Sequence, residues 1–278
     1  TKDIWNEIKK TIVGKDEIVL KILMAVFADG HILIEDIPGV GKTTMALTFS
    51  KVLGLKCNRM QFTPDVMPSD VVGFNVYNRE KSCFEYRDGA VMCNLFLADE
   101  INRTSPKTQS ALLQVMEEGS VTVDGVERQL PKPFTVIATQ NPYGSAGTLK
   151  SKKEQTRIKS VQAVSADELV QIKDYVRNIH VDDEIYRYVA QIAKVSRHSE
   201  AIIQGISPRG SIAIIGMAKA CAFVNGRDYV IPSDVSSVIE DVAAHRIVVK
   251  HGINSKRYPA REVIRDIVKR VDVPRIGR

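Results

Sequence analysis

Residues 38–43, with the sequence PGVGKT, are of the types that form a phosphate-binding loop. Glycines let main-chain N–H groups turn toward a ligand, and a helix that begins at such a loop adds partial positive charge. We expect the Lys42 ammonium to reach the β- and γ-phosphates of a nucleotide and the Thr43 hydroxyl to ligate Mg²⁺. The predicted nucleotide-binding residues of this loop are Pro38, Gly39, Val40, Gly41, Lys42, Thr43 and Thr44.

The loop departs from the usual pattern G-x-x-x-x-G-K-[ST], because its first position is Asp36. A carboxylate about 8 Å from a phosphate charge opposes that charge by roughly 2 kcal/mol at an effective dielectric constant of about 20. At the start of the loop, however, the side chain can turn away and accept hydrogen bonds from loop amides or a nearby hydroxyl. We therefore expect Asp36 to point away from the phosphates and to brace the loop.

Two adjacent carboxylates, Asp99 and Glu100, follow the apolar run LFLA at residues 95–98. Alternation along a strand sends neighbouring side chains in different directions, so the two carboxylates can have different roles. Asp99 suits Mg²⁺, bound directly or through water, and Glu100 can act as the general base that polarises an attacking water. A strand that simply ends in polar residues would have the same sequence, but the preceding phosphate loop favours the catalytic interpretation.

Asn141 and Arg209 are candidates for contacts with the γ-phosphate. Asn141 follows the apolar run at residues 134–139, although an Asn-Pro pair also commonly starts a turn. Arg209 lies in the first turn of a helix predicted to begin at Ser207-Pro208, where a cation opposes the helix dipole by about 0.3–1 kcal/mol. A phosphate that contacts the guanidinium would explain this local cost, and a nearby carboxylate could do the same.

Apolar runs alternate with helical patterns in the first half of the chain. The runs that predict buried strands are residues 31–34, 93–98 and 134–139. Residues 45–53 and 106–119 predict helices, so the pattern indicates an α/β fold whose mostly parallel sheet is covered on both faces. Period-two alternation at residues 74–86, and around the Asp-Gly turn of residues 121–126, predicts two β-hairpins inserted before core strands.

From about residue 165 onward the pattern is helical only. Residues 165–168 form a capping-box sequence, and Ser207-Pro208 and Pro232-Ser233 are typical of helix starts. We therefore expect three parts: an α/β core (1–149), a polar linker or junction (150–160), and a smaller all-helical domain (161–278).

The composition is that of an ordinary globular protein of 278 residues, with 44% hydrophobic and 26% charged residues. The net charge of +6 suits an acidic partner, but the absence of an arginine-rich block disfavours nucleic-acid binding. The four cysteines form no C-x-x-C pair and the histidines no H-E-x-x-H pattern, so we expect reduced thiols in a cytoplasmic protein. No apolar run approaches the ~18 residues of a membrane span.

These stretches together resemble the MoxR family of AAA+ ATPases over most of the chain. The block LFLADEINRTSPKTQSALLQVMEEGSVTVDG at residues 95–125 is the most specific match. The other matching stretches are IVGKDEIV (12–19), HILIEDIPGVGKT (31–43), QFTPDVMPSDVVG (61–73), ATQNPYGSAGT (138–148) and GISPRGS (205–211). MoxR-like loops often carry Glu-Asp before the Pro-Gly, so Asp36 agrees with the resemblance.

The resemblance implies a fold and a role for each candidate residue. It implies an AAA+ P-loop core followed by a helical lid domain, with ATP and Mg²⁺ as cofactors. Lys42 and Thr43 fall on Walker A, Asp99 and Glu100 on Walker B, Asn141 on sensor 1, and Arg209 on sensor 2, while Val13 and Gly14 match the segment that contacts adenine. Residues 74–86 correspond to the helix-2 insert and residues 120–130 to the pre-sensor-1 hairpin.

The resemblance also implies partners. Related ATPases form hexameric rings in which the two hairpins project toward the central pore. We accordingly expect a homo-oligomer that uses ATP for the chaperone-like remodelling or maturation of a partner protein, typically one with a von Willebrand factor A domain.

One departure from the family follows Thr148, where the chain continues directly into the basic segment 150–160. We infer that roughly 20–30 residues of the family pattern are absent at this point, either because that segment is mobile or because it is deleted. The absent stretch includes the arginine finger, worth about 10³–10⁵ in related phosphoryl-transfer systems, so no residue is assigned that role. Arg103 is a candidate to reach a neighbouring subunit, and an ordinary surface ion pair is the alternative.

Two other functions use the same residues. One is a nucleotide-gated binding module with little turnover, against which the intact Glu100 argues; multiple-turnover phosphate release separates the two. The other is a DNA-remodelling AAA+ ATPase, for which the basic pI is the only support. DNA-stimulated hydrolysis with a steep salt dependence would favour it.

Overall fold

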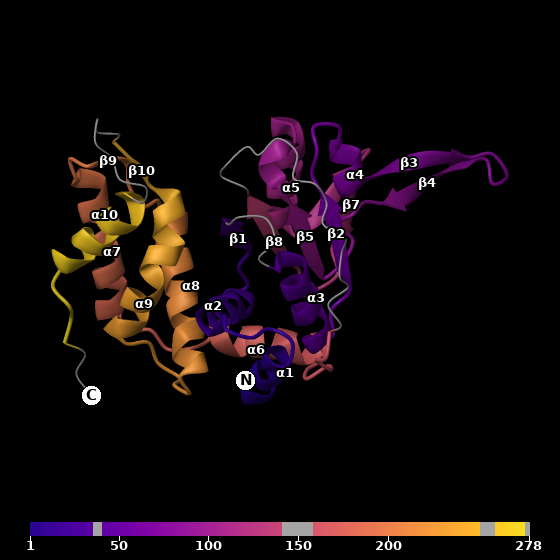
Figure 1. The fold of residues 1–278 in the computed structure, drawn as a ribbon. Coiled ribbons are helices and arrows are strands. Elements are labelled where there is room, and N and C mark those ends of the chain that lie inside the picture. Colours follow the sequence, from indigo (N-terminus) through magenta and orange to yellow (C-terminus); the bar gives the residue numbers. More distant parts are fainter. Residues whose placement is uncertain (36–40, 141–157, 251–258, 276–278) are drawn as a thin grey trace. The chain divides into compact units, whose positions relative to one another are not determined.

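The computed structural model describes residues 1–35, 41–140, 158–250 and 259–275. The chain divides into two compact units (Figure 1). The first comprises Thr1–Ile22 and His31–Gln171, and the second Leu23–Gly30 and Ile172–Arg278. Helices α2 (Asp16–Phe27) and α6 (Ala166–Arg177) contribute residues to both units. In the described ranges, every helix is too short or too polar to cross a membrane.

The core of the first unit is a four-stranded parallel sheet with the strand order β1-β8-β5-β2. Its strands are β1 (Ile32–Glu35), β2 (Cys57–Gln61), β5 (Leu95–Asp99) and β8 (Thr135–Gln140). All of β5 is buried, and so is β8 up to its last residue. Both strands are covered on two faces, which explains their uninterrupted apolar sequences. The predicted α/β fold with a parallel sheet is confirmed.

Strand β1 corrects the prediction that residues 31–34 form a buried strand. Within the described residues it pairs only with β8, so it forms one edge of the sheet. Leu33 is 42% exposed, and its neighbours Ile32 and Ile34 are half-buried. An apolar run predicts a strand but does not say how many neighbours that strand has. The opposite edge, β2, has the polar sequence CNRMQ and was not predicted.

Helices flank the sheet of the first unit (Figure 1). They are α1 (Lys2–Lys9), α3 (Lys42–Val52), α4 (Pro68–Val72), α5 (Pro106–Glu118) and the 3₁₀ turn η1 (Ile101–Arg103). Helix α5 begins as predicted, since the Ser105 side chain accepts a hydrogen bond from the Thr108 amide at 3.3 Å. Leu112 of α5 packs with Phe96 of β5 and Val136 of β8 in one buried cluster.

Both predicted hairpins are present. Strand β3 (Gly73–Asn78) pairs with β4 (Cys83–Asp88), and β6 (Ser120–Val123) pairs with β7 (Val126–Gln129), each pair antiparallel. The turn of the β6–β7 hairpin contacts the β3–β4 hairpin near the base of the latter, where Asn75 Nδ2 donates to Asp124 Oδ2 at 2.7 Å. The Arg128 guanidinium also lies 4.0 Å from the centre of the Tyr86 ring. Beyond these contacts the β3–β4 hairpin extends away from the sheet (Figure 1).

The second unit is mainly helical, as predicted. Its elements are α7 (Asp183–His198), α8 (Pro208–Val224), α9 (Pro232–Ala243), η2 (Ala244–Arg246) and α10 (Pro259–Lys269), with parts of α2 and α6. Ser207 caps α8 by accepting from the Gly210 amide, and Ser165 and Glu168 form the predicted capping box before α6. The term all-helical needs one correction, because β9 (Ile202–Gln204) and β10 (Val248–Val249) form a small antiparallel pair. Such short strands show no periodicity in sequence.

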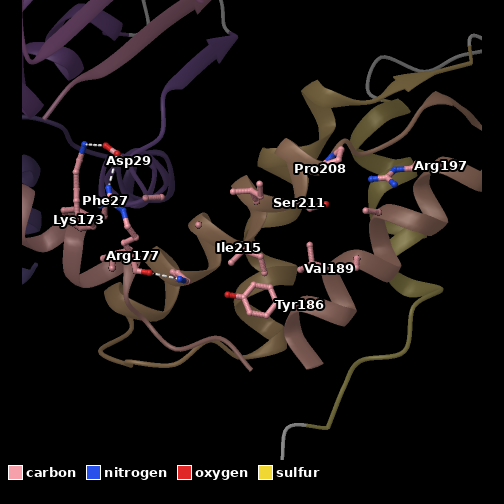
Figure 2. A pocket seen from close by; sticks show the side chains of 17 residues that line it. Phe27, Asp29, Lys173, Arg177, Tyr186, Val189, Arg197, Pro208, Ser211 and Ile215 are labelled. Atoms are coloured by element: carbon pink, nitrogen blue, oxygen red, sulfur yellow. Dashed lines mark hydrogen bonds and ion pairs between the residues drawn. The ribbon is translucent and has the colours of Figure 1, made fainter. Parts of the chain in front are cut away.

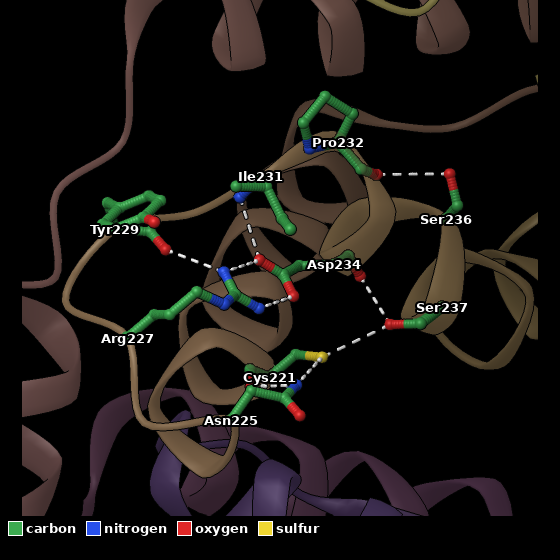
Figure 3. A network of polar contacts seen from close by, with 9 residues as sticks. All are labelled: Cys221, Asn225, Arg227, Tyr229, Ile231, Pro232, Asp234, Ser236 and Ser237. Carbon is green, nitrogen blue, oxygen red and sulfur yellow. Dashed lines mark hydrogen bonds and ion pairs between the residues drawn. The ribbon is translucent and has the colours of Figure 1, made fainter. Parts of the chain in front are cut away.

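A polar network connects α8 and α9 (Figure 3). Arg227 Nη1 and Nη2 donate to the two carboxylate oxygens of Asp234 at 2.8 and 2.6 Å. Asp234 is buried and also accepts from the Ile231 amide at 2.9 Å, so it caps α9. Ser237 Oγ donates to the Asp234 carbonyl at 2.8 Å and lies 3.4 Å from Cys221 Sγ. One bidentate ion pair therefore fixes the connection between the two helices.

Candidate nucleotide-binding site

Candidate site residues of the first unit gather at the carboxyl edge of its sheet. The strand register places Glu35 of β1 opposite Gln140 of β8, and Gln61 of β2 opposite Asp99 of β5. The strands therefore end at about the same level, and the phosphate loop begins just beyond β1. Open parallel sheets bind ligands at this edge, where strand ends and helix N-termini meet.

The described part of the phosphate loop leaves room for a ligand. Gly41 caps α3 with a φ of +80°, and a Cβ added there would meet no atom within 4 Å. Thr43 and Thr44 lie half-buried in the first turn of α3. Lys42 is the first residue of this helix, but its side chain lies outside the described residues. Pro38, Gly39, Val40 and Asp36 lie outside them too, so their roles stay predictions.

Asp99 is buried at the end of β5, and both of its carboxylate oxygens have partners. Arg59, on the neighbouring strand β2, donates from Nε to Oδ2 at 2.7 Å, and its Nη2 lies 2.7 Å from the same oxygen. The Thr139 hydroxyl of β8 donates to Oδ1 at 3.2 Å. Asp99 is only 7% exposed. The positively charged Arg59 guanidinium thus contacts a carboxylate that is largely shielded from water.

Glu100 directly follows β5 and has different partners. Its φ is +56°, which is uncommon for a residue with a side chain, and its amide donates to Thr139 Oγ1 at 3.0 Å. Its carboxylate accepts from Arg103 Nη1 at 2.8 Å, in an ion pair that is partly exposed. Arg103 is thus held within its own chain, as the surface ion-pair interpretation expects. The two adjacent carboxylates face separate arginines.

Val13 and Gly14 connect α1 to α2 in the first unit. Gly14 has a φ of +76°, and a Cβ added there would meet no atom within 4 Å. Val13 is 81% exposed. Both features leave room for a flat apolar ring beside this segment.

The structure does not describe Asn141 and Arg209 together with the other candidate site residues. Asn141 lies outside the described residues, directly after β8. Arg209 belongs to the second unit, where it is exposed in the first turn of α8 and takes part in an interaction there. Their roles as sensors stay predictions.

Comparisons with known proteins decide the family. Residues 31–157 match the family described as "ATPase family associated with various cellular activities (AAA)", and residues 194–267 match the AAA lid domain. The chain is 40% identical to YeaC of Bacillus subtilis, over 97% of this chain and 93% of YeaC. It is 34% identical to the chaperone MoxR1 of Mycobacterium tuberculosis, over 98% of this chain and 81% of MoxR1. The chain belongs to the MoxR family of AAA+ ATPases.

The fold agrees with this assignment. A crystal structure from Cytophaga hutchinsonii, of a protein described as an ATPase, has a TM-score of 0.88 and 30% identity, and covers 99% of this chain and 94% of its own. The predicted AAA+ core with a helical lid and the ATPase activity of this MoxR-family chain are therefore confirmed. The alignment with YeaC spans 298 positions, whereas this chain has 278 residues, so at least 20 of those positions have no counterpart here.

Sequence reasoning missed two residues at the site of this MoxR-family chain. Arg59 was not considered, because β2 itself was not predicted, and Thr139 was treated only as part of a strand end. A basic residue within the stretch Cys57–Gln61 was the available signal for Arg59. The pairing of β2 with β5, which places Arg59 beside Asp99, is visible only in the structure.

The residues present fit a magnesium ion that arrives with a nucleotide. Magnesium is usually bound by one or two carboxylates together with substrate phosphates, rather than by a cage of protein ligands. Asp99 supplies a buried carboxylate that forms an ion pair with Arg59, and Thr43 supplies a hydroxyl in the first turn of α3. Among the described residues, no group of three or more His, Cys, Asp or Glu side chains forms a metal cage.

A separate cavity of about 610 Å³ lies in the second unit (Figure 2). Its walls are mainly apolar and include Val189 of α7 and Ile212 and Ile215 of α8. At one end Lys173 Nζ donates to Asp29 Oδ1 at 2.7 Å. None of the residues predicted to bind nucleotide lines this cavity, and we assign it no role in the ATPase site.

Proposed function

We propose that this MoxR-family ATPase uses Mg²⁺-dependent ATP hydrolysis to remodel or mature a partner protein in a chaperone-like manner. The observation that carries the catalytic part is the separate placement of Asp99 and Glu100 at the carboxyl edge of the sheet. One carboxylate is buried beside a cation, and the other lies in a partly exposed ion pair. This division suits one residue that binds metal and one that handles a water and its proton.

The roles follow from this division. Asp99 and Thr43 would hold Mg²⁺, which supplies charge stabilisation at the phosphates when bound. Glu100 would accept the proton of the attacking water, for which its carboxylate must leave Arg103. Lys42 would contact the phosphates, Asn141 and Arg209 would detect the γ-phosphate, and Val13 and Gly14 would contact adenine.

We also propose that residues 1–149 form the ATPase core, 150–160 a junction and 161–278 the lid, in a hexameric ring located in the cytoplasm. The matches of residues 31–157 and 194–267 to the AAA and AAA lid families support a core followed by a lid, although the first match continues into the proposed junction as far as residue 157. The compact units of the structure have a different boundary, between Gln171 and Ile172. In addition, the segment Leu23–Gly30 belongs to the second unit. The ring and a partner with a von Willebrand factor A domain rest on the family resemblance.

The β3–β4 hairpin is the surface that we propose for contact with the partner. Phe84 is 71% exposed and Tyr77 is 51% exposed, although both are aromatic. The two residues are directly opposite in the ladder, and their ring centroids are 5.3 Å apart. Exposed aromatic side chains on a braced arm are typical of protein contact sites.

The test of the catalytic proposal is steady-state ATP turnover of the wild type and of Glu100→Gln over a range of protein concentrations. We expect the substitution to reduce turnover about 10²–10⁴-fold and to leave nucleotide binding intact. Glu118→Gln, an exposed carboxylate on α5, is the matched control and should keep wild-type turnover. Wild-type activity that rises faster than linearly with concentration would support assembly of a ring. Equal turnover of Glu100→Gln and wild type would contradict the proposal.

The contact of Glu100 with Arg103 favours one alternative, a nucleotide-gated binding module with little turnover. If nothing releases Glu100, the chain would bind ATP but rarely hydrolyse it. Multiple turnovers of phosphate release per chain would exclude this alternative, and release of less than one phosphate per chain would favour it.

A further inference from the structure

Arg59 lies at the candidate nucleotide site but has none of the roles proposed above. Its guanidinium approaches Asp99 Oδ2 with both Nε and Nη2, each at 2.7 Å. The other oxygen of the same carboxylate, Oδ1, accepts from the neutral hydroxyl of Thr139 at 3.2 Å. The two oxygens of Asp99 are thus used separately, one by a cation and one by a neutral donor.

A buried carboxylate needs such a partner. Asp99 is 7% exposed, and an ionised group removed from water is unstable unless a cation or several hydrogen bonds compensate it. Arg59 provides that compensation in the structure. Two cations on the same oxygen would repel each other, so Asp99 Oδ2 cannot serve Arg59 and a metal ion equally well.

We propose that Arg59 neutralises Asp99 while the site lacks metal and gives up Oδ2 when a magnesium nucleotide binds. This inference rests on the proposed function, since it takes Asp99 as the metal-binding carboxylate. Arg59 is a positioning residue in this account. Its side chain is 33% exposed, so the guanidinium has water to move into when it leaves the carboxylate.

The exchange has a thermodynamic consequence. A residue that must be displaced lowers the apparent affinity for the group that displaces it, and this coupling is reciprocal. Removal of Arg59 should therefore make the metal-free protein less stable and the Mg²⁺ requirement lower. If Arg59 instead stays on Asp99 and orients it for the metal, removal would raise the Mg²⁺ requirement. The sign of the shift distinguishes the two arrangements.

The experiment is a titration of Mg²⁺ into the full chain with a fluorescent ATP analogue, starting from EDTA, with thermal unfolding followed in parallel. For Arg59→Met we expect the Mg²⁺ midpoint of nucleotide binding to fall about tenfold, which is within the usual range of such couplings. The unfolding midpoint of Arg59→Met in EDTA should lie below that of the wild type, and magnesium nucleotide should narrow the difference. Arg59→Lys keeps the charge but loses the two-nitrogen contact, so its Mg²⁺ midpoint should fall less.

Control variants test whether a shift of the Mg²⁺ midpoint is caused by the contact between Arg59 and Asp99. Arg103→Met removes the arginine from the other carboxylate, Glu100, and should leave the Mg²⁺ midpoint unchanged. In an Asp99→Asn background, Arg59→Met should cause no further shift. Should Arg59→Met fail to fold, the same downward shift in Arg59→Lys carries the test. An unchanged or raised midpoint in the folded Arg59 variants would overturn this inference alone. Absence of any magnesium-dependent nucleotide binding by the wild type would overturn the proposed function as well.

Discussion

The hydroxyl of Thr139 accepts a hydrogen bond from the main-chain amide of Glu100 at 3.0 Å. The same hydroxyl donates to Asp99 at 3.2 Å, so one side chain of β8 contacts both carboxylate-bearing residues that end β5. Movement of the Asp99 carboxylate, for example when it exchanges Arg59 for a metal ion, would therefore act on the position of Glu100 through Thr139. The carboxylate that we propose to bind metal and the residue that we propose as general base are thus linked by a single buried hydroxyl.

This relationship predicts the effect of Thr139→Val. The valine has nearly the same shape but leaves the Glu100 amide without its acceptor and removes a donor from Asp99, and each buried group left unpaired costs about 1–3 kcal/mol. We expect ATP turnover to fall about 10–100-fold while magnesium nucleotide still binds. Thr139→Ser, which keeps the hydroxyl, should retain most of the turnover. Turnover of Thr139→Val within twofold of the wild type would contradict the link.

The stability of the second unit should depend strongly on the ion pair between Arg227 and Asp234. Because Asp234 is 2% exposed, Arg227→Met leaves a buried carboxylate without its bidentate partner. Removing one partner of a buried pair costs about 3–5 kcal/mol, so we expect the unfolding transition of this unit to shift strongly in urea. Arg261→Met is the matched control, because its pair with Asp241 is more exposed and worth about 1 kcal/mol or less. Equal effects of the two substitutions would contradict this account.

The stability of the chain should decline at alkaline pH because of Cys93. Burial raises the pKa of this thiol from 9.0 to about 11. Between these values the unfolded thiol loses its proton while the folded one keeps it, so the folded state binds more protons and stability falls as pH rises. The expected slope is about 1.4 kcal/mol per pH unit from pH 9 toward 11. Urea unfolding at pH 8, 9, 10 and 10.5 would measure it. Cys93→Ala should show a shallower decline, and an identical decline would show that other groups are responsible.

Substitutions in the β3–β4 hairpin should distinguish residues that contact a partner protein from residues that stabilise the hairpin. Phe84→Ser combined with Tyr77→Ser removes an exposed aromatic pair, so the unfolding free energy and the basal ATP turnover should stay near wild type. Tyr86→Ala should destabilise the arm, because its ring lies beneath Arg128 and its hydroxyl donates to the Val72 carbonyl. Stimulation of turnover by an identified partner protein should be lost in the double variant. Undiminished stimulation would exclude the aromatic pair as the contact.

Sequence reasoning was most successful where local rules decide the structure. The hairpins and the caps at Ser105 and Ser207 were predicted because turn and capping chemistry depends on a few adjacent residues. Strand β5 was predicted because burial on both faces gives an uninterrupted apolar run.

The errors concern relations between distant segments. The edge position of β1 and the existence of the polar strand β2 depend on which strands pair, and an isolated run does not carry that information. For the same reason the candidate carboxylates were found from sequence, whereas their partners Arg59 and Thr139 were not. These residues lie 40 positions from Asp99 in each direction and meet it only through strand register.

Calorimetric titration of ATP with Mg²⁺ into the folded chain tests the central claim most directly, namely that the loop around Lys42 and the carboxylate of Asp99 together bind a magnesium nucleotide. We predict saturable heat for the wild type, little or none for Lys42→Ala, and heat for Asp99→Asn that no longer depends on Mg²⁺. No heat with the wild type, or equal affinity of Lys42→Ala and the wild type, would contradict the claim.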